Sequence, residues 1–200
     1  MATGSVMWTN RFLCGPALAA SFFVAGCAPL DKLTAPSLSG TPATSSLVVV
    51  VCEATMLGVF DLRTRQKVEF GILTGKGGYG RFVGHAVSNL IVFSDIPPGE
   101  YYLSGVRTTW ATGNATAQTN SYVVPESKAP SLVVRTKLGE PSFLGVVAVE
   151  EVRKLHERGV NFTVKPSKEA EIETWERFVQ IYSGHPWADI AQQRLSELKR

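Results

Sequence analysis

The thiol of Cys27 is the side chain whose surroundings point most clearly to a chemical modification. A cysteine thiolate is a strong nucleophile, and here it directly follows three small or aliphatic residues, Val24, Ala25 and Gly26. Arg11 is the only charged residue among the first thirty, and residues 12–26 are apolar or small. A positive residue, a short apolar run and small residues, in this order, are typical of a secretory signal peptide. The sequence therefore predicts a secretory signal whose small residues lead directly into the Cys27 thiol.

The apolar run is too short to form a membrane-spanning helix. About 13–15 residues at about 1.5 Å each reach roughly 20 Å, whereas the hydrocarbon core of a bilayer is roughly 30 Å thick. Pro16 would weaken a spanning helix further. We therefore interpret this segment as a signal peptide, whose start is either Met1 or Met7; the start at Met7 has the more usual length.

The residues at 24–27 resemble the lipobox of bacterial lipoproteins, usually Leu-(Ala/Ser)-(Gly/Ala)-Cys, with Val24 in place of the leucine. The resemblance implies that the Cys27 thiol takes a diacylglyceryl group, that cleavage before Cys27 removes residues 1–26 as the signal peptide, and that the new amine of Cys27 is then acylated. Several acyl chains, at about 0.8 kcal/mol per buried methylene, make a stable anchor. Ala28, in place of aspartate, implies the outer membrane, with the protein facing the periplasm. An ordinary cleaved signal with an incidental cysteine remains the alternative.

The composition argues against a nucleic-acid partner and against a framework of disulfide bonds. The formal net charge is +3, which becomes +2 when Arg11 leaves with the signal, and no block of like charge indicates a nucleic-acid partner. Of the three cysteines, Cys14 lies in the signal and Cys27 is the proposed lipid site, so no intramolecular disulfide framework is predicted. Cys52 lies in a strongly apolar run, which favours a buried small hydrophobe over a nucleophile.

Other constellations with chemical potential do not meet the requirements of a site. Residues 75–80 match G-x-G-x-x-G, but a strand-like segment follows them where a nucleotide site needs a helix, so we predict a hairpin loop. The histidines at 85, 156 and 185 lack the spacing of metal ligands. Glu150 and Glu151 are adjacent, so in a strand they point to opposite faces. The sequence predicts no enzyme, no cofactor and no metal.

The remaining chain predicts a tether followed by a β domain. Residues 27–46 are rich in Pro, Ser, Thr, Ala and Gly and predict a flexible tether with a reach of about 25 Å. Short apolar runs rich in β-branched residues then recur, separated by turn signals, at 47–53, 59–62, 67–72, 81–83, 89–93, 100–109, 121–124, 131–136 and 142–150. This pattern predicts a mainly β fold, an antiparallel β-sandwich of about 7–9 strands over residues 47–152. The continuous run 47–53 indicates a strand that is buried on both faces.

Two short motifs in this domain carry a resemblance. Segment 95–103 reads Asp-Ile-Pro-Pro-Gly-Glu-Tyr-Tyr-Leu, in which Pro98 and Gly99 suit a turn. It resembles the Pro-Gly-x-Tyr corner of transthyretin-like and carboxypeptidase-regulatory-like domains. Together with segment 133–145, which contains Gly-Glu-Pro-Ser-Phe-Leu-Gly, it also resembles a family of uncharacterised bacterial lipoprotein domains. The resemblance implies a sandwich over residues 47–150 and lends no activity.

The C-terminal residues change to a helical period. Residues 153–166 are predicted to be a linker, and residues 167–200 an α-helical hairpin that turns at Gly184 and restarts at Pro186. The apolar faces of the two helices are Ile172, Trp175, Val179 and Tyr182, then Trp187, Ala191, Leu195 and Leu198. The hairpin resembles one tetratricopeptide-like unit, which is too little for a solenoid. It must therefore dock on the β domain, dimerise or bind a partner.

The first functional hypothesis is a lipid-anchored, non-catalytic interaction or structural module of the cell envelope, with an envelope protein as partner and an unknown oligomeric state. The alternative is a small-ligand or glycan-binding module that uses loops 75–80 and 110–120. In that alternative the contact residues would be Tyr79, Trp110 and Tyr122, with Trp110 and Tyr122 packed as a cross-strand pair. An envelope hydrolase is a third hypothesis, for which the sequence offers no converging residues.

Overall fold

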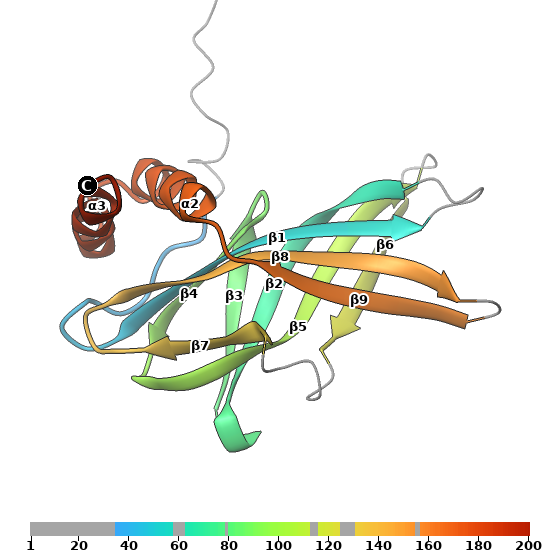
Figure 1. The fold of residues 1–200 in the computed structure, drawn as a ribbon, viewed down its shortest axis with the longest axis horizontal. Helices are drawn as coiled ribbons and strands as arrows, with labels where there is room; N and C mark the ends of the chain where they lie inside the picture. Colours follow the sequence, from blue (N-terminus) through green and yellow to red (C-terminus); the bar gives the residue numbers. More distant parts are fainter. Residues whose placement is uncertain (1–34, 58–62, 79, 113–115, 125–130, 155–156) are drawn as a thin grey trace, which may run out of the picture.

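The described residues of this computed structural model form nine strands followed by two α-helices (Figure 1). The structure describes residues 35–57, 63–78, 80–112, 116–124, 131–154 and 157–200. The strands are β1 (Ser46–Leu57), β2 (Arg63–Gly75), β3 (Arg81–Val87), β4 (Leu90–Ile96), β5 (Gly99–Thr112), β6 (Thr116–Val123), β7 (Val133–Thr136), β8 (Pro141–Lys154) and β9 (Glu157–Lys165). The helices are α2 (Lys168–Ile181) and α3 (Pro186–Leu198). The prediction of a mainly β fold with a C-terminal helical hairpin is confirmed.

All strands belong to one sheet, with the order β6-β5-β2-β3-β4-β1-β8-β9. β7 pairs with β5. β1 also pairs with β2, so the two ends of the run β2-β3-β4-β1 meet. Among the described strands, every pairing is antiparallel except that of β1 with β8, which run parallel. The parallel pair departs from the predicted antiparallel arrangement, because the residue pattern of a strand does not encode the direction of its neighbour.

The sheet curls over itself and encloses the main core between its two halves (Figure 1). The core joins residues of β1 and β8 with residues of β2, β4, β5 and β6, among them Val50, Val147, Phe93 and Leu103. Shifts of register in the β2–β5 and β1–β8 pairings supply the extra local twist that such curling needs. At the shift in the β1–β8 pairing, Gly145 has a φ of 122°, a backbone conformation that favours glycine.

β1 is buried on both faces, as the continuous apolar run predicts. Val48, Val50 and Cys52 point into the main core. Leu47 and Val49 point to the opposite face and pack with α2 and α3 in a second core cluster. The hairpin therefore docks on the outer face of the sheet within the same chain, which decides among the three alternatives that the sequence left open.

Both helices lie within the predicted hairpin: α2 ends at Ile181, three residues before Gly184, and α3 begins at Pro186 as predicted. Ser167 caps α2, because its hydroxyl accepts a hydrogen bond of 3.2 Å from the Ala170 amide. Gly184 has φ of 90° in the turn, and Pro186 is the first residue of α3. The buried helix residues of the second cluster are Trp175, Phe178, Tyr182, Trp187, Ala191 and Leu195. Among the described residues, no helix is long and apolar enough to span a membrane.

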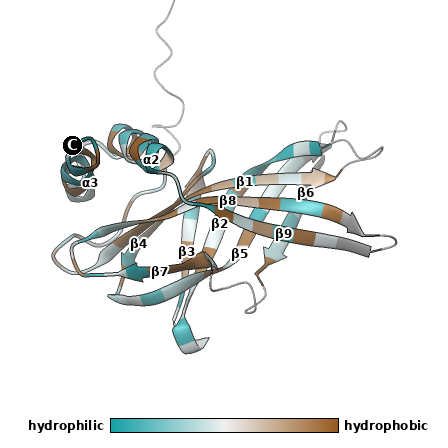
Figure 2. Cartoon of the chain, viewed as in Figure 1, coloured by the Kyte–Doolittle hydropathy of each residue, from teal (hydrophilic) through white to brown (hydrophobic). Residues whose placement is uncertain are grey.

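The predicted linker over residues 153–166 is wrong for its larger part, because Glu157–Lys165 forms β9 on the outer edge of β8. Val160, Phe162 and Val164 alternate along β9 and pack against the main core. Figure 2 shows hydrophobic residues recurring along this strand. This alternation is a period-2 signal that the sequence analysis missed.

The predicted flexible tether is also wrong for its second half. The Ser39 amide donates to the Ser94 hydroxyl of β4 at 3.1 Å, and the Gly139 amide donates to the Ser45 carbonyl at 3.0 Å. Ala35 and Leu38 pack against the second core cluster. Residues 35–46 thus belong to the folded domain, and the first half of the tether lies outside the described residues.

Candidate functional site

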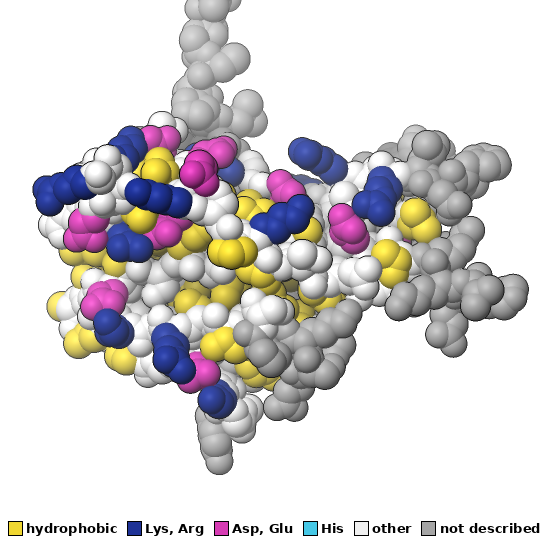
Figure 3. All heavy atoms as spheres, in the orientation of Figure 1, with side chains coloured by type: hydrophobic (Ala, Val, Ile, Leu, Met, Phe, Trp, Pro, Cys, Tyr) yellow, Lys and Arg dark blue, Asp and Glu magenta, His cyan; other side chains and the backbone are white. Residues whose placement is uncertain are grey.

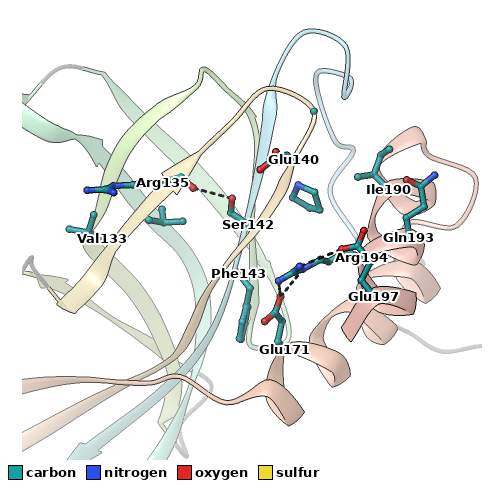
Figure 4. A pocket seen from close by; sticks show the side chains of 13 residues that line it. Val133, Arg135, Glu140, Ser142, Phe143, Glu171, Ile190, Gln193, Arg194 and Glu197 are labelled. Carbon is teal, nitrogen blue, oxygen red and sulfur yellow. Dashed lines mark hydrogen bonds and ion pairs between the residues drawn. The ribbon is translucent and has the colours of Figure 1, made fainter. Parts of the chain in front are cut away.

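A groove lies between the helical hairpin and the β7–β8 turn (Figure 4). Its volume is about 710 Å³, and five of its thirteen lining residues are charged. It exists because the hairpin covers only part of the outer face of the sheet, so α3 and the start of β8 form two walls. We refer to it as the junction groove.

Arg194 and Glu171 join the two helices at one wall of the junction groove. The Nε and Nη2 atoms of Arg194 lie 3.2 Å and 3.1 Å from Oε1 of Glu171, and Nη1 lies 3.5 Å from Oε2 of Glu197. The Trp175 indole N–H donates to the same Glu171 oxygen at 3.3 Å. Because the Arg194 side chain is 41% exposed, the ion pair contributes at most about 1 kcal/mol to stability. Its main effect is to hold a guanidinium in a defined position on the groove.

The opposite wall combines charged and apolar side chains. Arg135 lies 3.6 Å from Glu100, and the Ser142 hydroxyl donates to the Arg135 carbonyl at 3.3 Å. Figure 4 shows Phe143 and Ile190 on the two sides of the groove. Charged side chains of both signs lie next to one another over the hairpin and the adjacent sheet (Figure 3). Such a surface can bind a segment that offers both apolar contacts and hydrogen-bonding groups.

Tyr122, one of the predicted contact residues, lies in the main core instead of on the surface. Its hydroxyl donates to Oε1 of Glu151 at 2.9 Å and accepts from the Gln66 amide at 2.9 Å and the Asn120 amide at 3.4 Å. The Thr108 hydroxyl bonds the carbonyl of the same Gln66. Burial, with a further contribution from the Glu151 carboxylate, raises the pKa of Tyr122. The residue is a polar crosslink between β2, β6 and β8.

Trp110 is not the cross-strand partner of Tyr122. In the β5–β6 register Trp110 faces Gln118, and Tyr122 faces Val106, so the two aromatic rings are four residues apart along the strands. β5 continues to Thr112 and β6 begins at Thr116, so most of the predicted 110–120 loop is strand. The indole nitrogen of Trp110 is buried without a hydrogen-bond partner among the residues described.

The two loops of the predicted ligand site lie at opposite ends of the β2–β5 pair. Gly75 faces Tyr101, whereas Lys67 faces Thr109. Eight residue steps along β2 correspond to about 27 Å, so one small ligand cannot contact both loops. The predicted hairpin loop joins β2 to β3: Lys76–Gly78 form a short 3-10 turn, and the Gly75 amide donates to the Gly80 carbonyl at 3.1 Å. Tyr79 lies outside the described residues.

The remaining candidates have structural surroundings or lie outside the described part. Cys52 is fully buried, and desolvation, with a smaller contribution from Glu53, raises the pKa of its thiol to about 12, so it behaves as the predicted small hydrophobe. The His185 ring accepts a bond of 3.2 Å from the Trp187 amide and caps α3. In the described residues, no three His, Cys, Asp or Glu side chains converge as metal ligands. The lipobox-like residues are all outside the described part: Val24, Ala25, Gly26 and Cys27.

Sequence reasoning missed the junction groove entirely. Glu171 and Arg194 lie 23 residues apart on different helices, and Phe143 comes from a strand. No spacing rule joins these residues, because they meet only when the hairpin docks. Comparison with protein-family models, with curated proteins and with solved structures found no match.

Proposed function

We propose that this chain is a lipid-anchored lipoprotein of the cell envelope, attached through Cys27, whose folded part is a non-catalytic module that binds an envelope protein. The signal-like residues 1–26 and the lipobox-like context of Cys27 support the anchor. Ala28 favours the outer membrane, with the domain in the periplasm. The observation that carries the binding role is the junction groove.

The composition of the junction groove fits a protein segment better than a small molecule. Small-ligand sites enclose most of their ligand and are lined predominantly by apolar side chains. Here Arg135, Arg194 and three glutamates line an open groove beside Phe143 and Ile190. Arginine is enriched in protein–protein interfaces, where its guanidinium bonds backbone carbonyls and carboxylates. A short segment of a partner protein can contact the charged and the apolar side chains of the groove at the same time.

The position of the groove relative to the anchor also supports this proposal. Ala35, the first described residue, packs against the same core cluster as Phe143 and Ile190 of the groove. Eight residue steps separate Cys27 from Ala35, so their Cα atoms lie at most about 29 Å apart. A lipid on Cys27 would keep the hairpin side of the domain close to the membrane surface. The expected partner is therefore membrane-bound or membrane-proximal.

Metabolic labelling with a clickable palmitate analogue tests the anchor. Wild type and Cys52→Ala should be labelled, and Cys27→Ala should lose the label and leave the membrane fraction. Cys52→Ala is the matched control, because Cys52 is buried in the folded domain. Label that persists in Cys27→Ala would refute lipidation at this residue. Cleavage without any label would show an ordinary secreted protein.

Photo-crosslinking in intact envelopes tests the binding role separately. Gln193 lines the junction groove, and its exposed neighbour Gln192 does not. A photoreactive amino acid at 193 should capture one defined protein, and Arg194→Ala should reduce that capture at least threefold. The same probe at 192 is the control. Equal capture profiles at 192 and 193 would contradict binding in the groove, whatever the outcome of the labelling.

A further inference from the structure

Strand β6 lies at an edge of the described sheet, and its own residues lack the features that usually prevent further pairing. Among the described residues it pairs only with β5, in a register that is unbroken over eight residue pairs. Its sequence, Thr-Ala-Gln-Thr-Asn-Ser-Tyr-Val, contains no charge and no proline. Edge strands normally carry lysine, proline or a bulge that prevents further pairing. β9, the edge at the other end, includes Glu157, Arg158 and Lys165.

The hydrogen bonds of β6 show which backbone groups face outward. The Val124 amide donates to the Ser104 carbonyl at 3.0 Å, so 104 and 124 are a hydrogen-bonded pair that continues the β5–β6 register. Hydrogen-bonded and non-hydrogen-bonded pairs alternate in an antiparallel ladder. The amides and carbonyls that point away from β5 are therefore those of Ala117, Thr119, Ser121 and Val123. The Val123 side chain is 76% exposed.

We propose that this edge pairs with β6 of a second copy of the chain, antiparallel, about a two-fold axis at Asn120. In this register Thr119 of one copy faces Ser121 of the other, and Ala117 faces Val123. All four outward-facing residues then form hydrogen-bonded pairs, and four pairs with two bonds each give about eight hydrogen bonds between the copies. The two sheets become one continuous sheet across the dimer.

The chemistry of the edge favours a second copy over an unrelated strand. The self-pairing places a threonine opposite a serine, a favourable cross-strand pair, and covers the exposed Val123 with Ala117. β6 carries no charged residue, so no charge repulsion between the two β6 strands opposes the two-fold arrangement. An isologous contact also closes after two chains and does not continue into a fibre. This dimer requires neither the lipid anchor nor the junction groove.

Two double variants with the same number of added charges test the register. Thr119 and Ser121 have exposed side chains, so both positions accept charges without changing the core. T119K/S121K places lysine opposite lysine, whereas T119K/S121E places lysine opposite glutamate. For the full-length chain, analytical ultracentrifugation should show a dimer for wild type and T119K/S121E. T119K/S121K should raise the dimer dissociation constant at least tenfold, while its circular dichroism stays unchanged.

Cysteine crosslinking gives an independent readout of the same axis. Across the proposed axis the two copies of Asn120 form a non-hydrogen-bonded pair with Cα atoms about 4.5 Å apart, within the range of a disulfide. The Cα atoms of the two copies of Gln118 are then about 14 Å apart, too far to bridge. Under mild oxidation N120C should form a disulfide-linked dimer, and Q118C and wild type should not. A wild type that stays monomeric at 100 µM, equal behaviour of the two lysine variants, or crosslinking at 118 instead of 120 would overturn the proposal.

Discussion

Replacing Tyr122 by phenylalanine removes one oxygen atom from the centre of the polar cluster in the main core. That oxygen donates to Glu151 and accepts from Gln66, each at 2.9 Å. Tyr182→Phe is a closely matched change in the second core cluster, because both tyrosines are 7% exposed. Among the residues that the structure describes, the buried Tyr182 hydroxyl has no hydrogen-bond partner. The two variants therefore remove the same atom from a satisfied and from an unsatisfied site.

The expected magnitudes follow from what each site loses. In Tyr122→Phe the buried Gln66 amide loses a partner, which costs about 1–3 kcal/mol, and the bond to the Glu151 carboxylate is also lost. The free energy of unfolding should fall by about 2–3 kcal/mol, or roughly 4–12 °C in Tm for a chain of this size. In Tyr182→Phe an unpaired buried hydroxyl disappears, so stability should stay constant or rise by about 1 kcal/mol.

Urea unfolding followed by far-UV circular dichroism measures both variants against wild type. If the slope of the free energy of unfolding against urea concentration is the same in all three proteins, the variants differ in stability and not in the denatured state. The result that refutes the reasoning is equal destabilisation of Tyr122→Phe and Tyr182→Phe, because hydrogen bonding at position 122 would then have no measurable effect. Stability gained in Tyr122→Phe would refute it as well.

Three further outcomes are expected. In the folded state the Cys52 pKa is raised from 9.0 to about 12, so the stability that this thiol contributes is complete below pH 9 and is lost as the pH rises toward 12. Between pH 9 and 10 this loss amounts to about 1 kcal/mol of the free energy of unfolding. Cys52→Val should abolish that part of the pH dependence, as measured by urea unfolding at each pH. Phe178→Ala should cost about 3–5 kcal/mol, because Phe178 is fully buried where the hairpin meets the sheet, and a loss below 1 kcal/mol would contradict the docking. Arg194→Met should cost less than about 1 kcal/mol, because its ion pair is partly exposed, and a larger loss in thermal unfolding would assign it a structural role.

The periodic parts of the fold could be read from the sequence because their signals are local. The run at 47–53 predicts a doubly buried strand, and the faces around Trp175 and Trp187 predict two helices that meet an apolar surface. β9 was missed although Val160, Phe162 and Val164 alternate in it. The error there lies in the interpretation, since the pattern was present.

The site was less accessible to sequence reasoning. Whether Tyr122 faces solvent or core depends on which strand lies above it, and Glu151 comes from β8, 29 residues away. The register that places Trp110 opposite Gln118 depends on the turn between β5 and β6. The sequence around an aromatic residue in a strand does not indicate whether its side chain lies on a binding surface or forms hydrogen bonds in the core.

The sequence by itself determined the strand and helix content, the two-faced burial of β1 and the chemical context of Cys27, because short runs of neighbouring residues encode each of them. Only the tertiary structure decided the parallel pairing of β1 with β8, the docking of the hairpin on the outer face and the open edge at β6. The junction groove also belongs to this second group. Each of these features depends on contacts between segments far apart in the chain, and their geometry exists only once the sheet has curled and the hairpin has packed against it.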